Sequence, residues 1–112
     1  MVKVEKVLKA LSDRNRLRIV NMLTEKPMCV CEITEVLRLG QSTVSGHLRV
    51  LKEAELAEDV KSGLWVEYHL RRDREPMARI LDVILASLAG DRQLAEDRVA
   101  ALRVDRAIIC KK

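Results

Sequence analysis

The most informative segment of the sequence is QSTVSGHLRVLKEA, which spans residues 41–54. Its apolar residues Val44, Leu48 and Leu51 recur at helical spacing, which predicts a helix with one buried face. The rest of the helix carries side chains that can donate or accept hydrogen bonds: Gln41, Ser42, Thr43, Ser45, His47 and Arg49. A helix that begins with such residues is suited to reading base edges in the major groove of DNA. We therefore interpret residues 41–54 as a recognition helix.

Gly46 interrupts this predicted helix, where a glycine costs about 1 kcal/mol relative to alanine. Its presence is explained if another molecule approaches the helix backbone closely at that point. Three nearby basic residues, Arg16, Lys52 and Lys61, are candidate contacts to DNA phosphates, although side chains of this kind are also commonly solvated or paired. Residues 38–72 carry six basic and five acidic side chains, so charge alone is weak support for DNA binding.

The flanking segments predict a winged helix-turn-helix. A short helix follows Pro27, and the turn at residues 39–41 joins it to the recognition helix, so residues 29–55 form the helix-turn-helix. Two β-prone runs, residues 57–61 and 64–70, meet at Ser62 and Gly63. Glycine at such a connection favours a hairpin, which makes residues 57–70 the wing.

The remaining segments predict a single, mostly α domain over residues 1–112, with the element order α-α-α-α-β-β-α-α. Helices are expected at residues 4–11, after a cap at Asp13, from about Asp73, and over residues 94–109. The helix at residues 4–11 and the helix from about Asp73, the first and fifth in the chain, carry more apolar residues than one small core uses. We expect the excess to face a second copy of the chain.

Composition narrows the class of protein. The chain has 112 residues, a net charge of +4, 48% hydrophobic and 34% charged residues, and only 2% aromatic residues. This is globular composition, and no apolar stretch approaches the roughly 18 residues that span a bilayer, so no membrane partner is expected. Three cysteines without disulfide-scaffold density favour reduced thiols in a cytoplasmic protein.

The sequence resembles the ArsR/SmtB family of small winged-helix repressors. The resemblance is carried by LSDRNRLRIV at residues 11–20, by residues 41–54, and by KSGLWVEYHL at residues 61–70. It implies a homodimeric transcriptional repressor, not an enzyme, that binds double-stranded operator DNA. It also implies that the helices within residues 1–11 and 73–109 form the dimer interface.

The candidate sensing residues are Cys29 and Cys31. Residues two apart on a regular helix do not face each other, so the two sulfurs can chelate one ion only if the third helix begins irregularly. A helix N-terminus also lowers the pKa of a thiol, and thiolates select soft ions. In the family that this sequence resembles, Cys-Val-Cys at this place is the inducer site of arsenite- and cadmium-responsive members.

This resemblance predicts no obligatory cofactor and an inducer that is As(III) or Sb(III), with Cd(II), Zn(II) or Pb(II) as alternatives. Cys110 is a candidate third ligand. Some arsenic-responsive members carry a further cysteine where this chain has Thr34. The fifth helix contains Asp82 but no histidine, so the zinc site that other members form there is not expected.

Three other interpretations stay open. Oxidation or persulfidation of the thiols could replace ion binding as the switch. Cys29 and Cys31 could form a dithiol oxidoreductase, although the usual Cys-x-x-Cys motif on a βαβ scaffold is absent. The chain could also bind DNA without any effector, with both cysteines serving as small buried residues.

Overall fold

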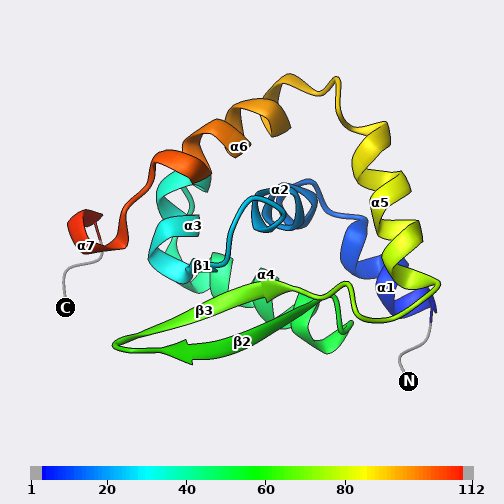
Figure 1. Cartoon of the computed structure of the whole chain (residues 1–112), viewed down its shortest axis with the longest axis horizontal. Coiled ribbons are helices and arrows are strands. Elements are labelled where there is room, and N and C mark those ends of the chain that lie inside the picture. The colour runs from blue at the N-terminus through cyan, green and yellow to red at the C-terminus, as the bar shows by residue number, and fades with distance from the viewer. Residues whose placement is uncertain (1–3, 110–112) are drawn as a thin grey trace.

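The structure is a computed structural model that describes residues 4–109. Figure 1 shows a helical body with a long β-hairpin along one side. Along the chain, the elements are α1 (Val4–Leu11), α2 (Arg14–Leu23), β1 (Met28–Cys29), α3 (Val30–Leu37), α4 (Gln41–Glu53), β2 (Ala57–Ser62), β3 (Trp65–Leu70), α5 (Met77–Ser87), α6 (Arg92–Arg103) and α7 (Arg106–Ile109). The predicted winged helix-turn-helix is confirmed, with β1 and α7 as additions.

Local side-chain chemistry sets several helix boundaries. The Asp13 carboxylate accepts hydrogen bonds from the backbone N–H groups of Asn15 and Arg16, which caps α2 as predicted. The left-handed residue of the turn before α4 is Arg38, with φ of 60°, one residue before the predicted turn at residues 39–41. Gly40 is the extended N-cap residue of α4.

The wing belongs to a three-stranded antiparallel sheet of order β1-β3-β2. The sequence predicted only the β2–β3 hairpin, which is present, with Val60 opposite Glu67 and Ser62 opposite Trp65. The two-residue strand β1 adds the pairs Met28–Tyr68 and Cys29–Glu67. The segment that carries the first cysteine is therefore hydrogen-bonded directly to the wing.

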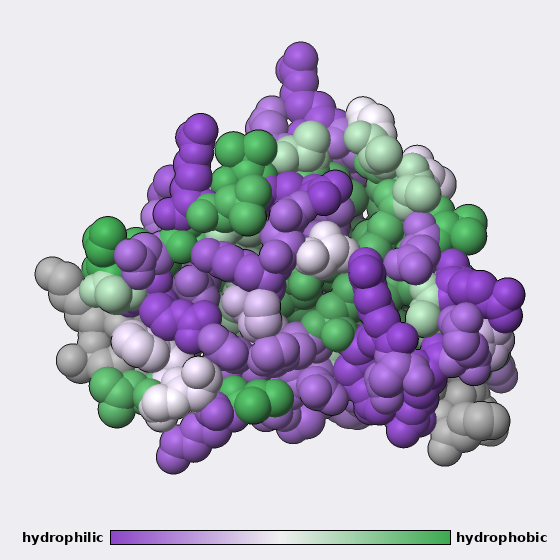
Figure 2. All heavy atoms as spheres, in the orientation of Figure 1, coloured by the Kyte–Doolittle hydropathy of each residue, from purple (hydrophilic) through white to green (hydrophobic). Residues whose placement is uncertain are grey.

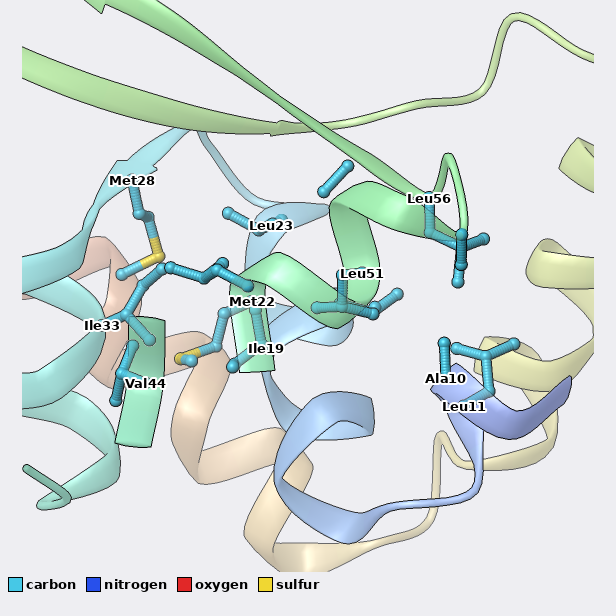
Figure 3. Close-up of a cluster of buried hydrophobic side chains, with 14 of the residues drawn as sticks. Ala10, Leu11, Ile19, Met22, Leu23, Met28, Ile33, Val44, Leu51 and Leu56 are labelled. Carbon is cyan, nitrogen blue, oxygen red and sulfur yellow. The ribbon is translucent and has the colours of Figure 1, made fainter. Parts of the chain in front are cut away.

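The core lies where α2, α3 and α4 meet, and α1 and the start of the wing close it (Figure 3). Met28 of β1 points its thioether toward Ile33 of α3, close to Val44 of α4 in the same view. All three side chains are fully buried. Because α3 and α4 share this packing, a displacement of the start of α3 must also disturb α4.

The C-terminal helices wrap around the helix-turn-helix. In Figure 1, α6 passes above α2 and leads to α7 beside α3, whereas α5 lies at the opposite end of the molecule. Arg18 of α2 makes two hydrogen bonds to the buried carboxylate of Asp97 on α6, at 2.8 and 3.0 Å. The helix predicted over residues 94–109 is divided, because α6 ends at Arg103 and Val104 is extended.

Helix α5 begins at Met77, later than predicted, and buries only one large apolar residue completely, Leu81. Val83 is 68% exposed, and Ile80 is also exposed. Hydrophobic atoms accordingly reach the surface over α5, at the right of Figure 2. Among residues 4–109, no helix combines the length and apolar character needed to cross a bilayer.

Candidate nucleic-acid interface and thiol site

Helix α4 presents the predicted recognition surface. Val44, Leu48 and Leu51 are fully buried and hold the helix on the body. The predicted contact residues lie outside this stripe: Gln41, Ser42, Thr43 and Arg49 are exposed, and Ser45 and His47 are half-buried. The amphipathic pattern thus leaves the N-terminal turn of α4 open to a ligand, which is the part of a recognition helix that contacts bases.

Two of the three basic residues predicted to contact phosphates, Arg16 and Lys52, instead make contacts within the protein. Arg16 donates to the backbone carbonyls of Ala10 and Lys9, and its Nη1 lies 3.2 Å from Nδ1 of His47. Lys52 forms an ion pair with Asp59 on β2, at 2.9 Å. These contacts fix the position of α4 relative to α1 and the wing. Lys61 lies exposed near the end of β2.

Gly46 faces open space. A Cβ atom placed there would meet no atom of this chain within 4 Å, apart from the neighbouring backbone of its own helix. Packing within the described chain therefore gives no reason for a glycine in the middle of α4.

Cys29 and Cys31 lie together at the start of α3. The helix begins irregularly there, which is the condition that binding of one ion by both sulfurs requires. Cys29 is the N-cap residue, with extended backbone angles of −88° and 166°, and Cys31 is in the first turn. Their Sγ atoms are 3.1 Å apart. Cys29 is buried, at 2% exposure, and Cys31 is half-buried. An extended residue followed by a helix is what brings side chains two apart in sequence to one side.

The chemistry of this pair differs from the prediction in one respect. Burial raises the pKa of the Cys29 thiol above its ordinary value, so the expected lowering by the helix N-terminus is outweighed. The guanidinium of Arg106 acts in the opposite direction. Binding of one ion by both sulfurs requires Cys29 and Cys31 to be reduced and deprotonated.

Two functional candidates were not found from the sequence, Glu32 and Arg106. Glu32 is buried, and its Oε1 accepts hydrogen bonds from the backbone N–H of Cys29 and from Nη2 of Arg106, both at 3.0 Å. The sequence signal for Glu32 was its place three residues after the cap. Arg106 had no such signal, because its partners are 39 and 74 residues away.

Other metal ligands are scarce in residues 4–109, where no group of three or more histidine, cysteine, aspartate or glutamate side chains is placed to hold an ion. The predicted third ligand, Cys110, lies outside the described residues. Asp82 on α5 is exposed and lies 3.4 Å from Arg72.

Comparison with known proteins identifies the family. The chain is 40% identical over 73 residues to the uncharacterized HTH-type transcriptional regulator MJ1325 of Methanocaldococcus jannaschii, a match that covers 64% of this chain and 82% of that protein. Residues 13–59 also match the model of the bacterial regulatory protein arsR family. The chain belongs to the ArsR family. It is therefore a transcription regulator of a non-enzymatic family, which removes the dithiol oxidoreductase interpretation.

Two further relatives within the ArsR family carry functional names. The arsenical resistance operon repressor of Staphylococcus xylosus is 33% identical over 85 residues, which cover 75% of this chain and 82% of the repressor. The arsenic resistance transcriptional regulator ArsR1 of Pseudomonas putida is 42% identical over 65 residues, or 57% of this chain. The match spans only about half, 51%, of the Pseudomonas regulator.

Solved structures of similar fold agree with this assignment to the ArsR family. Reduced HlyU from Vibrio cholerae superposes with a TM-score of 0.66 at 27% identity, covering 76% of this chain and 87% of HlyU. The transcriptional repressor BigR from Xylella fastidiosa gives a TM-score of 0.64 at 28% identity, with coverage of 78% and 87%.

Proposed function

We propose that this ArsR-family chain is a homodimeric repressor that binds operator DNA through α4 and the wing and releases it when Cys29 and Cys31 bind As(III) or Sb(III). The observation that carries the proposal is the 3.1 Å separation of the two sulfurs at the start of α3. The names of the Staphylococcus and Pseudomonas relatives support arsenic as the inducer. Soft divalent ions such as Cd(II) are the next candidates. The cadmium resistance transcriptional regulatory protein CadC homolog of Staphylococcus aureus is 41% identical to this chain over 68 residues.

DNA binding is supported by the exposed polar turn of α4 and by the wing beside it. Gln41, Ser42, Thr43, Ser45, His47 and Arg49 would contact base edges, with Lys61 on the DNA backbone. Arg16 and Lys52 would reach phosphates only by sharing or exchanging their present partners. In a homodimer, the two recognition helices would meet half-sites about 34 Å apart, one turn of DNA.

Dimerisation is supported by the exposed apolar residues at one end of the molecule. Val4 and Leu8 of α1 and Ile80 and Val83 of α5 are all exposed in the isolated chain. Apolar residues clustered in this way are typical of interaction surfaces. The helices within residues 1–11 and 73–109 are therefore the proposed dimer interface.

The release step would start at the cap of α3. An ion held by both sulfurs fixes the geometry of Cys29 and Cys31, and α3 transmits the strain through Ile33 and Val44 to α4. Reversing a 99:1 population requires the ion to bind the released state more tightly than the DNA-bound state by about 5.5 kcal/mol. Operator DNA must then weaken arsenite binding by the same factor.

The test is an anaerobic titration of fully reduced protein with arsenite, cadmium and zinc, followed by thiolate absorbance in the ultraviolet. We expect a stoichiometric rise with arsenite that Cys29→Ser abolishes. Cys110→Ser provides the matched variant, because its response shows whether a third thiol takes part. A flat response to all three ions contradicts the proposal of ion sensing.

Thiol oxidation is the second candidate for the switch, and the 3.1 Å approach of the Cys29 and Cys31 sulfurs is the observation that favours it. In this case an oxidant removes two electrons and two protons from a pair of thiols to form the disulfide. Release of DNA by peroxide, with no effect of arsenite on the reduced protein, would establish this alternative over ion sensing.

A further inference from the structure

Arg106 of α7 joins three parts of the molecule that are distant in sequence. Its Nη1 donates to Glu67 Oε2 on strand β3 at 2.9 Å, and its Nη2 donates to Glu32 Oε1 on α3 at 3.0 Å. The guanidinium also lies over the ring of Trp65, 5.7 Å from the ring centroid. Arginine is suited to this arrangement, because its planar fork can serve two carboxylates and an aromatic face at once.

On the α3 side, the contact leads directly to the cysteine pair. Glu32 Oε1 also accepts the backbone N–H of Cys29, so one oxygen is shared between the helix cap and Arg106. Glu32 is only 2% exposed, and a buried carboxylate requires compensating positive charge. Lys26 Nζ is more distant, at 3.8 Å, so Arg106 provides the closer compensation.

On the wing side, the contact leads to the outer half of the hairpin. Glu67 lies opposite Cys29 in the β1–β3 pairing, and Trp65 begins β3 next to the hairpin turn. The indole Nε1 of Trp65 is buried and has no hydrogen-bond partner in the described part of the chain. Packing and the stacked guanidinium therefore hold the ring in place.

We propose that Arg106 is a positioning residue that transmits a change at the Cys29–Cys31 pair to the wing. The inference rests on the proposed function of that pair as the effector site. When a bound ion fixes Cys29, the N-cap geometry and the shared Glu32 oxygen shift together. Arg106 then loses its hydrogen bond to Glu32, and its contacts with Glu67 and Trp65 change as a result.

Trp65 makes the inference measurable, because it is the single tryptophan of the chain. Reduced wild-type protein, Arg106→Gln and Arg103→Gln are titrated anaerobically to saturation with arsenite. Thiolate absorbance reports arsenite binding, and Trp65 fluorescence emission reports a change in the conformation of the wing. Arg103 is the matched control, since it is exposed three residues earlier and its substitution removes the same charge.

We expect wild type and Arg103→Gln to show both signals. Arg106→Gln should keep the full absorbance change while its Trp65 response falls at least threefold. Circular dichroism checks folding, and Arg106→Lys carries the test if the glutamine variant fails to fold. Lysine keeps the charge but lacks the fork, so we expect it to retain only part of the Trp65 response.

Two results would overturn the transmitting role: a full Trp65 response in Arg106→Gln, or loss of arsenite absorbance in that variant. The first would mean that the signal travels another way, such as through the β1–β3 pairing. The second would make Arg106 part of the binding site itself. If arsenite caused no rise in thiolate absorbance in wild type, the proposed function would be contradicted. The transmitting role of Arg106, which rests on that function, would then be contradicted as well.

Discussion

In the proposed DNA-binding surface, some side chains are already engaged in contacts within the protein and others are free to contact a ligand. Arg16 and Lys52 are already engaged with the backbone of α1 and with Asp59, whereas Thr43 and Arg49 are exposed. An engaged cation contributes less to binding, because its existing contact must be given up or shared. Sequence-specific contacts are therefore expected from the exposed N-terminal turn of α4, and Arg16 and Lys52 are expected to orient it.

We expect Gly46→Ala to have opposite effects on the stability of the protein and on its affinity for DNA. Alanine in a helix interior is favoured over glycine, so we expect the free energy of unfolding to rise by up to about 1 kcal/mol. The added methyl group meets nothing in the chain but would obstruct a closely approaching DNA backbone. We expect weaker binding to an operator duplex, measured by fluorescence anisotropy. Unchanged affinity would show that DNA does not approach this position closely.

The link between α2 and the start of α6 gives a pH-dependent prediction. Arg14 donates two hydrogen bonds to Asp91 and lowers the pKa of that carboxyl to about 2. A group whose pKa is depressed on folding stabilises the protein above its unfolded pKa, near 3.8, and loses this effect as the pH falls toward 2.

We therefore expect Asp91→Asn to flatten the decline of unfolding free energy between pH 4 and 2, measured by urea denaturation at each pH. Asp82→Asn is the control, since Asp82 is exposed and pairs with Arg72 at the longer distance of 3.4 Å. An equal flattening in both variants would contradict the assignment to Asp91.

At the scale of elements, α6 is held to the helix-turn-helix by a buried ion pair. Asp97 accepts from Arg18 and from Gln93, and Asn21 donates to the carbonyl of Leu94. Removal of one member of a buried pair leaves the other charge uncompensated, which costs about 3–5 kcal/mol. The position of α6 beside α2 and α3 thus depends on polar contacts as well as on its thin apolar face.

Asp97→Ala should lower the free energy of unfolding by about 3 kcal/mol, as measured by chemical denaturation. The neighbouring Glu96→Ala is the control, because Glu96 is exposed and its loss should change stability by less than about 0.5 kcal/mol. Similar losses in the two variants would mean that the Arg18 pair does not anchor α6.

Element by element, local sequence signals predicted most of the fold, and contacts between distant segments account for what was missed. The apolar spacing of α4 and the cap at Asp13 are local, and both are confirmed. Strand β1 has only two residues, so it has no periodicity of its own and exists through pairing with β3. Arg38 takes the left-handed position that glycine usually occupies, a choice that residue preference alone does not predict.

The candidate site was predictable to a similar extent. The spacing of Cys29 and Cys31 was visible, together with the condition of an irregular helix start that the structure meets. The raised pKa of Cys29 was not, because it depends on burial by the tertiary structure. The roles of Glu32 and Arg106 also required the folded chain, since α7 reaches back to α3 and β3 only after the break at Val104.

At the scale of the whole molecule, the proposed dimer controls the spacing of the two recognition helices. Val83→Asp on the exposed face of α5 should convert the dimer to a monomer in analytical ultracentrifugation, because it places a charge in an apolar interface. Val60→Asp on β2 introduces the same change at an exposed position outside both interface segments and should leave the dimer intact. Monomers in both variants, or in neither, would contradict an interface centred on α5.

Operator release by the reduced protein tests whether Cys29 and Cys31 form the switch. A duplex enriched from a random pool is bound by wild type, Cys29→Ser and Cys31→Ser, and fluorescence anisotropy follows release as arsenite is added anaerobically. We expect all three proteins to bind DNA and only wild type to release it, at stoichiometric arsenite. Equal release from the serine variants, or no release from wild type, would contradict the claim that Cys29 and Cys31 form the switch.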